Sequence, residues 1–150
     1  MATRLKQWVP GCAIVLAVAL ACGVPLYIQF HRITEKQDET TCRVSLQMLA
    51  AATLKYAQDH DHRLPQASTW WTDVYPRYDF QVEICPKQAC DIGYAMSPAL
   101  SGADIRKVPH PEQTILLYEA CGGIPEYRHR GGMNVAYADG HASWIPGPKR

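Results

Sequence analysis

The run His129-Arg-Gly-Gly-Met-Asn-Val-Ala-Tyr-Ala-Asp-Gly-His-Ala-Ser-Trp-Ile145 decides the fold of the C-terminal half of this chain. Within it, Asp139-Gly140 lies between two segments with alternating apolar residues, Asn134 to Ala138 and Ala142 to Ile145. Asp-Gly supplies the positive φ values that a tight type I′ turn requires. The sequence therefore predicts a β-hairpin, one face of which packs on a core.

Two more strands are expected before this hairpin. Thr114 to Glu119 is the stronger candidate, and Tyr94 to Met96 is a short one. Eight prolines follow Pro65 and separate short segments of chain. The C-terminal half is therefore predicted to be a small antiparallel sheet with long connections.

A helix is expected over Thr34 to Gln58, which contains neither proline nor glycine. Its small and apolar residues recur at helical spacing and form one stripe: Cys42, Leu46, Leu49, Ala50, Thr53 and Ala57. Asp59-His-Asp-His62 should end the helix before Leu64-Pro65. We interpret these four polar residues as a solvated turn rather than a metal site.

A membrane anchor is predicted over Trp8 to Phe30, which has no charged side chain. The stretch is long enough to cross a hydrocarbon core of about 30 Å as a helix. Arg4 and Lys6 precede it and favour a cytoplasmic N-terminus. We therefore expect a cytoplasmic N-terminus over 1–7, a transmembrane helix over 8–30 and an extracytoplasmic domain over 31–150.

Details of the anchor support this interpretation. Trp8, Tyr27 and Phe30 lie near the two ends of the span, where aromatic residues gather at membrane interfaces. Pro25 removes one helical hydrogen bond and predicts a local kink. The anchor and the amphipathic segment could form one long helix. Ala19-Leu-Ala-Cys22 loosely resembles a lipoprotein cleavage box, so lipidation is an alternative.

Six cysteines fall into two groups. Cys12 and Cys22 lie in the span and are expected to be apolar fillers. Four others would face an oxidising space, where three pairings are possible: Cys42, Cys85, Cys90 and Cys121. Our first choice is a local Cys85–Cys90 disulfide, which would leave Cys42 to pair with Cys121. An exchange of partners among these cysteines is one alternative. A four-thiolate zinc site is the alternative, but the spacing lacks a second close pair, so no metal or cofactor is expected.

The chain resembles proteins with a prepilin-type processing-associated H-x9-DG domain, which are pilin-like or pseudopilin-like. The signature residues are His129, Asp139 and Gly140. Four other segments are similar to the family's helix, its two central motifs and the strand before its final hairpin: Cys42 to Pro65, Ile84-Cys-Pro86, Gly93-Tyr-Ala-Met96 and Thr114 to Glu119. The similarity covers most of residues 42 to 145.

This resemblance implies an α+β fold in which a long N-terminal helix, half transmembrane and half amphipathic, packs on a small antiparallel sheet. It also implies a bacterial inner-membrane protein with a periplasmic domain, acting by protein contacts in a type II secretion or type IV pilus-like assembly. Its partners would be the other membrane-complex subunits and the lipid bilayer. We expect His129 to hydrogen-bond backbone or Asp139 and so lock the hairpin, although Glu119, Asp139 and His141 could also converge with it.

Other functions are less favoured. The net charge of +1 gives no clustered basic face for nucleic acid. No phosphate loop, nucleophile elbow or zinc-protease helix is present in the sequence, so an enzyme is not expected. Gly11-Cys-Ala-Ile-Val-Leu16 lacks the acidic residue of a prepilin N-terminus. A repurposed subunit that stabilises a larger complex, such as a photosynthetic or respiratory one, therefore remains an alternative, as does a lipoprotein or metal-binding module.

Overall fold

The computed structural model describes residues 8–75, 85, 87 and 90–148, and the side chains of the first helix from residue 19 onward. The expected cytoplasmic segment, 1–7, lies outside the described residues. The chain divides into two compact units, Met1–Lys36 and Gln37–Arg150. Among the described residues, the core cluster and the buried site residues belong to the second unit.

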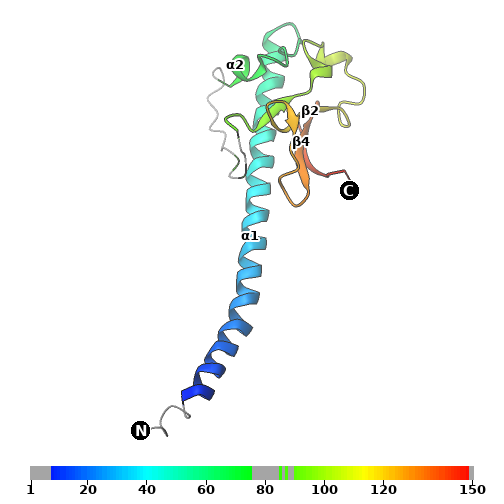
Figure 1. The fold of residues 1–150 in the computed structure, drawn as a ribbon. Coiled ribbons are helices and arrows are strands. Elements are labelled where there is room, and N and C mark those ends of the chain that lie inside the picture. The colour runs from blue at the N-terminus through cyan, green and yellow to red at the C-terminus, as the bar shows by residue number, and fades with distance from the viewer. Residues whose placement is uncertain (1–7, 76–84, 86, 88–89, 149–150) are drawn as a thin grey trace. The chain divides into compact units, whose positions relative to one another are not determined.

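Helix α1 runs from Trp8 to Asp59 and contains Pro25 (Figure 1). The expected amphipathic segment therefore lies within one long helix. The helix ends where predicted, because Asp61 and His62 take positive φ values of 53° and 62°. Side chains with a Cβ rarely adopt such values, and the helical path cannot continue through them.

Among the described residues, no helix is both long enough and apolar enough to cross a membrane.

The sheet is antiparallel throughout, as expected. Its strand order is β1-β2-β4-β5, with β3 paired to β2 beside this path. The bounds are β1 Tyr94–Met96, β2 Ile115–Cys121, β3 Ile124–Pro125, β4 Gly132–Tyr137 and β5 Ala142–Pro146. The short β3 and three short helices, α2 Trp70–Val74, η2 Pro98–Leu100 and η3 Ile105–Lys107, were not predicted.

The β4–β5 hairpin forms where predicted, but its turn is of a different type. Gly140 has a φ of 94°, whereas Asp139 is not among the residues with positive φ. The amide of Gly140 donates to the carbonyl of Tyr137 at 2.9 Å, and the amide of Tyr137 donates to the carbonyl of His141 at 2.9 Å. These bonds close a three-residue loop in which glycine alone takes the left-handed conformation. The predicted type I′ turn is therefore wrong.

The predicted stripe on α1 is confirmed as the helical side of the core. All six of its members are buried: Cys42, Leu46, Leu49, Ala50, Thr53 and Ala57. Leu46, Leu49 and Ala50 belong to one cluster with Leu116, Leu117 and Ala136 of the sheet. The hydroxyl of Thr53 donates to the carbonyl of Leu49 at 2.7 Å, so this buried polar group has its partner.

Strand β4 is more deeply placed than a strand with one solvated face. Its first five residues are all buried, including Asn134. The second half of α1 lies beside β2 and β4 (Figure 1). The fold of the second unit is thus a helix packed on a small antiparallel sheet, the α+β arrangement expected from the sequence.

Candidate functional site

The signature residue His129 lies in the turn that leads into β4. Its amide and carbonyl pair with those of Gly132 at 3.0 and 2.9 Å. Arg130 and Gly131 make this tight connection with φ values of 52° and 74°. The indole Nε1 of Trp144 in β5 donates to the carbonyl of His129 at 2.8 Å. The backbone of His129 is therefore fixed, and its imidazole is completely buried.

The imidazole meets Glu119, which lies on β2 opposite Tyr94 of β1. Nε2 of His129 is 3.0 Å from Oε1 of Glu119, and both side chains are fully buried. Asn134 holds the carboxylate from β4, because its backbone amide donates to Oε2 at 2.9 Å and its Nδ2 donates to Oε1 at 3.0 Å. Nδ2 also donates to the carbonyl of Glu39 in α1 at 3.2 Å. The buried carboxylate therefore has partners from two directions.

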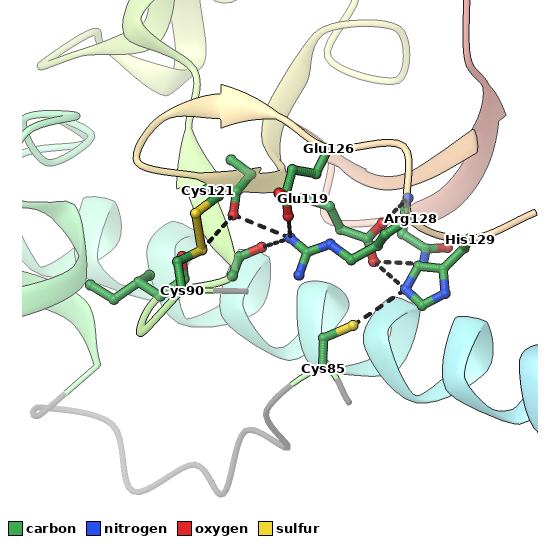
Figure 2. A network of polar contacts seen from close by, with 11 residues as sticks. Cys85, Cys90, Glu119, Cys121, Glu126, Arg128 and His129 are labelled. Atoms are coloured by element: carbon green, nitrogen blue, oxygen red, sulfur yellow. Dashed lines mark hydrogen bonds and ion pairs between the residues drawn. A yellow bond between two sulfur atoms is a disulfide. The ribbon is translucent and has the colours of Figure 1, made fainter. Parts of the chain in front are cut away.

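Two free cysteines complete the cluster. Cys85 Sγ lies 3.4 Å from Nε2 of His129, and Cys42 Sγ, on α1, lies within 4.8 Å of Cys85 Sγ. One donor atom from each of the four side chains, Cys42, Cys85, Glu119 and His129, lies within 4.8 Å of the other three. Figure 2 shows Cys85 and Glu119 approaching the same edge of the His129 ring.

These contacts change the acidity of the groups. The hydrogen bond with Cys85, burial and the nearby charges raise the pKa of Cys42, whereas the same hydrogen bond lowers the pKa of Cys85 to about 5. Burial opposes a charged imidazole at His129, but hydrogen bonds to Cys85 and Glu119 outweigh it and raise its pKa to about 9. These shifts favour ionisation of Cys85 over that of Cys42.

Arg128 fastens the loop that carries His129. Its Nη2 donates to the carbonyl of Gly93 at 2.6 Å and to that of Ala120 at 3.2 Å. The same nitrogen lies 3.3 Å from Oε2 of Glu126. The side chain is only 7% exposed, so the screening that weakens surface ion pairs is reduced. Arg128 thus ties the His129 loop to the edge where β1 and β2 meet (Figure 2).

The cysteine pairing differs from the expected one. Cys90 is bonded to Cys121, while Cys42 and Cys85 are free. The register explains this result: Tyr94 of β1 pairs with Glu119 of β2, so the chain just before β1 reaches the end of β2. The Cα atoms of Cys90 and Cys121 are consequently 5.8 Å apart, within the range of a disulfide. Both pairings predicted from sequence, Cys85–Cys90 and Cys42–Cys121, are wrong.

The other signature residues lie in a different place from His129. Asp139 accepts a hydrogen bond from the amide of His141 at 3.1 Å and lies 2.6 Å from its Nδ1. This pair is in the hairpin loop and partly exposed. The expected bond from His129 to Asp139 is wrong, because His129 turns inward to Glu119. Of the four residues considered for convergence, Glu119 and His129 meet, and Asp139 and His141 form a separate pair.

The anchor residues can be placed in part. Pro25 lies inside α1, and the side chains of Tyr27 and Phe30 are 64% and 65% exposed. Tyr27 packs edge-on against His31, with ring centroids 4.5 Å apart. The side chain of Trp8 lies outside the described residues.

The buried cluster itself was not predicted from sequence. The sequence predicts disulfides from Cys42 and Cys85 to other cysteines, and it gives Asn134 no role in a site. It also predicts a solvated surface position for Arg128, which is wrong, because that side chain is only 7% exposed. A signal was nevertheless present, because each of four family-like segments contributes one member. These are the helix with Cys42, the Cys85-Pro86 motif, the strand ending in Glu119 and the signature beginning at His129.

The cluster is not arranged as a nucleophilic relay. In a Cys–His–Glu relay the two ring nitrogens would contact the thiol and the carboxylate separately. Here Nε2 of His129 faces both Cys85 and Glu119. Nδ1 is buried and has no hydrogen-bond partner among the described residues. The four donor atoms instead lie within 4.8 Å of one another, which is close enough to share one ion.

Comparison with known proteins finds no matching family model, no matching curated protein and no matching solved structure.

Proposed function

We propose that this chain is a non-catalytic, pilin-like protein of the bacterial inner membrane. Its N-terminus faces the cytoplasm, and its α+β domain lies in the periplasm. It acts by protein contacts in a type II secretion or type IV pilus-like assembly. The observation that carries the proposal is the uncovered apolar surface of α1 between Leu20 and Ile33.

Seven large apolar side chains in this part of α1 are between 46% and 65% exposed: Leu20, Val24, Leu26, Tyr27, Ile28, Phe30 and Ile33. At about 100° per residue they occupy more than half of the helix circumference. A helix that is apolar on most sides needs lipid or other helices around it. This surface therefore favours a bilayer with neighbouring helices as its environment.

The sequence before Leu20 extends the same character. Residues 8 to 30 carry no charged side chain. At 1.5 Å per residue a helix over this stretch rises by roughly 34 Å, against a hydrocarbon core of about 30 Å. The proposed anchor is therefore long enough.

The buried cluster supports a non-catalytic role. Glu119 and His129 are fully buried, and Cys85 is 1% exposed. A nucleophile must reach its substrate, and these groups lie under the surface of the second unit. Their hydrogen bonds also lack the order of an acid–base relay.

Membrane partition of the full chain tests the anchor. We expect the wild-type protein to stay in the membrane pellet after an alkaline carbonate wash. Val24→Asp should release it, because an acidic residue within a span costs about 2.5–3.5 kcal/mol. Val44→Asp is the matched control, since Val24 and Val44 are both valines of α1 with 49% exposure. Release of the wild-type chain into the soluble fraction would refute the anchor.

Gentle detergent extraction tests the assembly. The chain should migrate with other subunits in size separation, and mass spectrometry of the complex should identify them. Secretion or pilus components would support the proposal. Subunits of a bioenergetic complex would favour the repurposed alternative, which rests on the absence of an acidic residue in Gly11 to Leu16. Migration as a free monomer would contradict both.

A further inference from the structure

Four potential metal ligands come together from four separate parts of the second unit. Cys42 belongs to α1, Cys85 to the segment before β1, Glu119 to β2 and His129 to the turn before β4. All four are buried, with exposed fractions of 0%, 1%, 0% and 0%. Acidic groups that cluster by chance are usually exposed, whereas these four residues are buried. A fully buried carboxylate beside an imidazole and two thiols needs compensation of its charge.

The separations suit a tetrahedral ion. A Zn²⁺ ion with Zn–S bonds of about 2.3 Å and Zn–N bonds of about 2.0 Å sets its ligand atoms roughly 3.3–3.8 Å apart. His129 Nε2 lies 3.4 Å from Cys85 Sγ and 3.0 Å from Glu119 Oε1. All four donor atoms lie within 4.8 Å of one another. Side-chain movements of up to about 1 Å would bring the set to these ideal distances.

The neighbouring residue Asn134 prepares the carboxylate for such a role. It donates to both oxygens of Glu119, from its backbone amide and from Nδ2. Metal-binding carboxylates are commonly oriented by hydrogen bonds of this kind. The second bond of Nδ2, to the carbonyl of Glu39, links the same support to α1.

We infer that Cys42, Cys85, Glu119 and His129 form a closed structural site for a zinc-type divalent cation. Two sulfur ligands select a soft or borderline ion over Ca²⁺ and Mg²⁺, which prefer oxygen. Four protein ligands leave no open position, which is the pattern of structural rather than catalytic zinc. Each thiol that binds releases its proton to solvent. The ion cross-links α1 to the sheet. This structural role is independent of the proposed assembly function.

The competing chemistry is oxidation of the two free thiols. The sulfur atoms of Cys42 and Cys85 lie within 4.8 Å of each other, and a disulfide between them would remove both sulfur ligands. In that case a disulfide would join α1 to the segment before β1, and the buried Glu119–His129 pair would lie beside it. The two outcomes are chemically exclusive and can be separated by experiment.

Elemental analysis of the full chain, purified in mild detergent without chelator or reductant, is the first test. We expect about one zinc per chain, as in other closed four-ligand sites. After removal of the metal, Co²⁺ should restore occupancy and give the visible absorption of a tetrahedral site together with a thiolate charge-transfer band. These signals come from the wild-type protein, so they do not depend on whether variants fold.

Variants then assign the ligands. Cys42→Ser, Cys85→Ser and His129→Ala should each weaken Co²⁺ binding by at least about tenfold. His141→Ala is the matched control, because His141 also lies beside a carboxylate, that of Asp139 at 2.6 Å. Its Co²⁺ affinity should equal that of the wild type. Peptide mapping that joins Cys42 to Cys85, absence of bound zinc, or a Co²⁺ spectrum without the thiolate band would overturn the inference.

Discussion

Nε2 of His129 lies 3.0 Å from Oε1 of Glu119, and neither side chain is exposed to solvent. The chain holds a second His–Glu pair, in which Nδ1 of His110 is 3.6 Å from Oε1 of Glu112, but there the side chains are 78% and 51% exposed. A histidine–glutamate pair thus occurs once buried and once exposed to solvent. Comparing the two pairs shows how much burial changes the contribution of such a pair to stability.

Glu119→Gln should destabilise the fold by about 3–5 kcal/mol, the cost of breaking one side of a buried pair. Both oxygens of Glu119 accept bonds from Asn134, so an amide nitrogen in either place would face a donor. Glu112→Gln should change stability by less than about 0.5 kcal/mol. Denaturant titration of the full chain with chelator present measures both losses without a contribution from metal. Equal losses for the two variants would contradict the buried pair.

The disulfide gives a second prediction. Replacing Cys90 and Cys121 together with serine should cost about 3–4 kcal/mol, from the entropy of a cross-linked loop with a sequence separation of 31. Cys22→Ser is the control, because Cys22 is free and exposed. The midpoint of denaturant unfolding reports the loss. A peptide map that links Cys85 to Cys90 instead would refute the assigned pairing.

Local patterns in the sequence were sufficient to predict the helix and most strands. The spacing of Cys42, Leu46 and Leu49 is a property of one segment, and these residues are buried as predicted. Asp139-Gly140 likewise predicted the hairpin. The turn type was wrong because Asp-Gly suits both two-residue and three-residue loops. The choice between them depends on how β4 and β5 are paired.

The candidate site could not be predicted in the same way, because it depends on register between distant strands. Cys90 reaches Cys121 only because Tyr94 pairs with Glu119. Once that pairing is known, Cys85 is left without its expected partner. Sequence spacing alone made Cys85 and Cys90 look like a pair, since five positions along a loop suggest proximity. The three-dimensional path of the chain decides otherwise.

The hairpin loop allows a prediction about pH. The hydrogen bond from the amide of His141 and the adjacent imidazole lower the pKa of Asp139 below its usual range. Because the folded-state pKa is depressed, the stabilisation is present above the unfolded-state pKa and is lost as pH falls through the folded value. An NMR titration should place this carboxyl below an ordinary aspartate. His141→Ala should move it back toward the usual value, and an unchanged titration would contradict the contact.

The last prediction concerns the turn that presents His129. A methyl group on Gly132 would collide with the backbone carbonyl of Ile145 and the ring of Trp144. The backbone cannot yield easily within a paired strand, so Gly132→Ala should destabilise the fold by about 3 kcal/mol. Trp144 would also be pushed from the carbonyl of His129, which its indole contacts at 2.8 Å. The indole N–H resonance of Trp144 should therefore shift.

Gly131→Ala is the matched control for that variant, one residue earlier in the same turn. Nothing lies within 4 Å of its added Cβ, but its φ of 74° is unfavourable for alanine. We expect a loss of about 1 kcal/mol from this backbone strain alone, with little change in the Trp144 resonance. If the two variants lost the same stability and shifted that resonance equally, the collision with Ile145 and Trp144 could not be the cause. The position of His129 would then not depend on the hydrogen bond that Trp144 donates to its carbonyl.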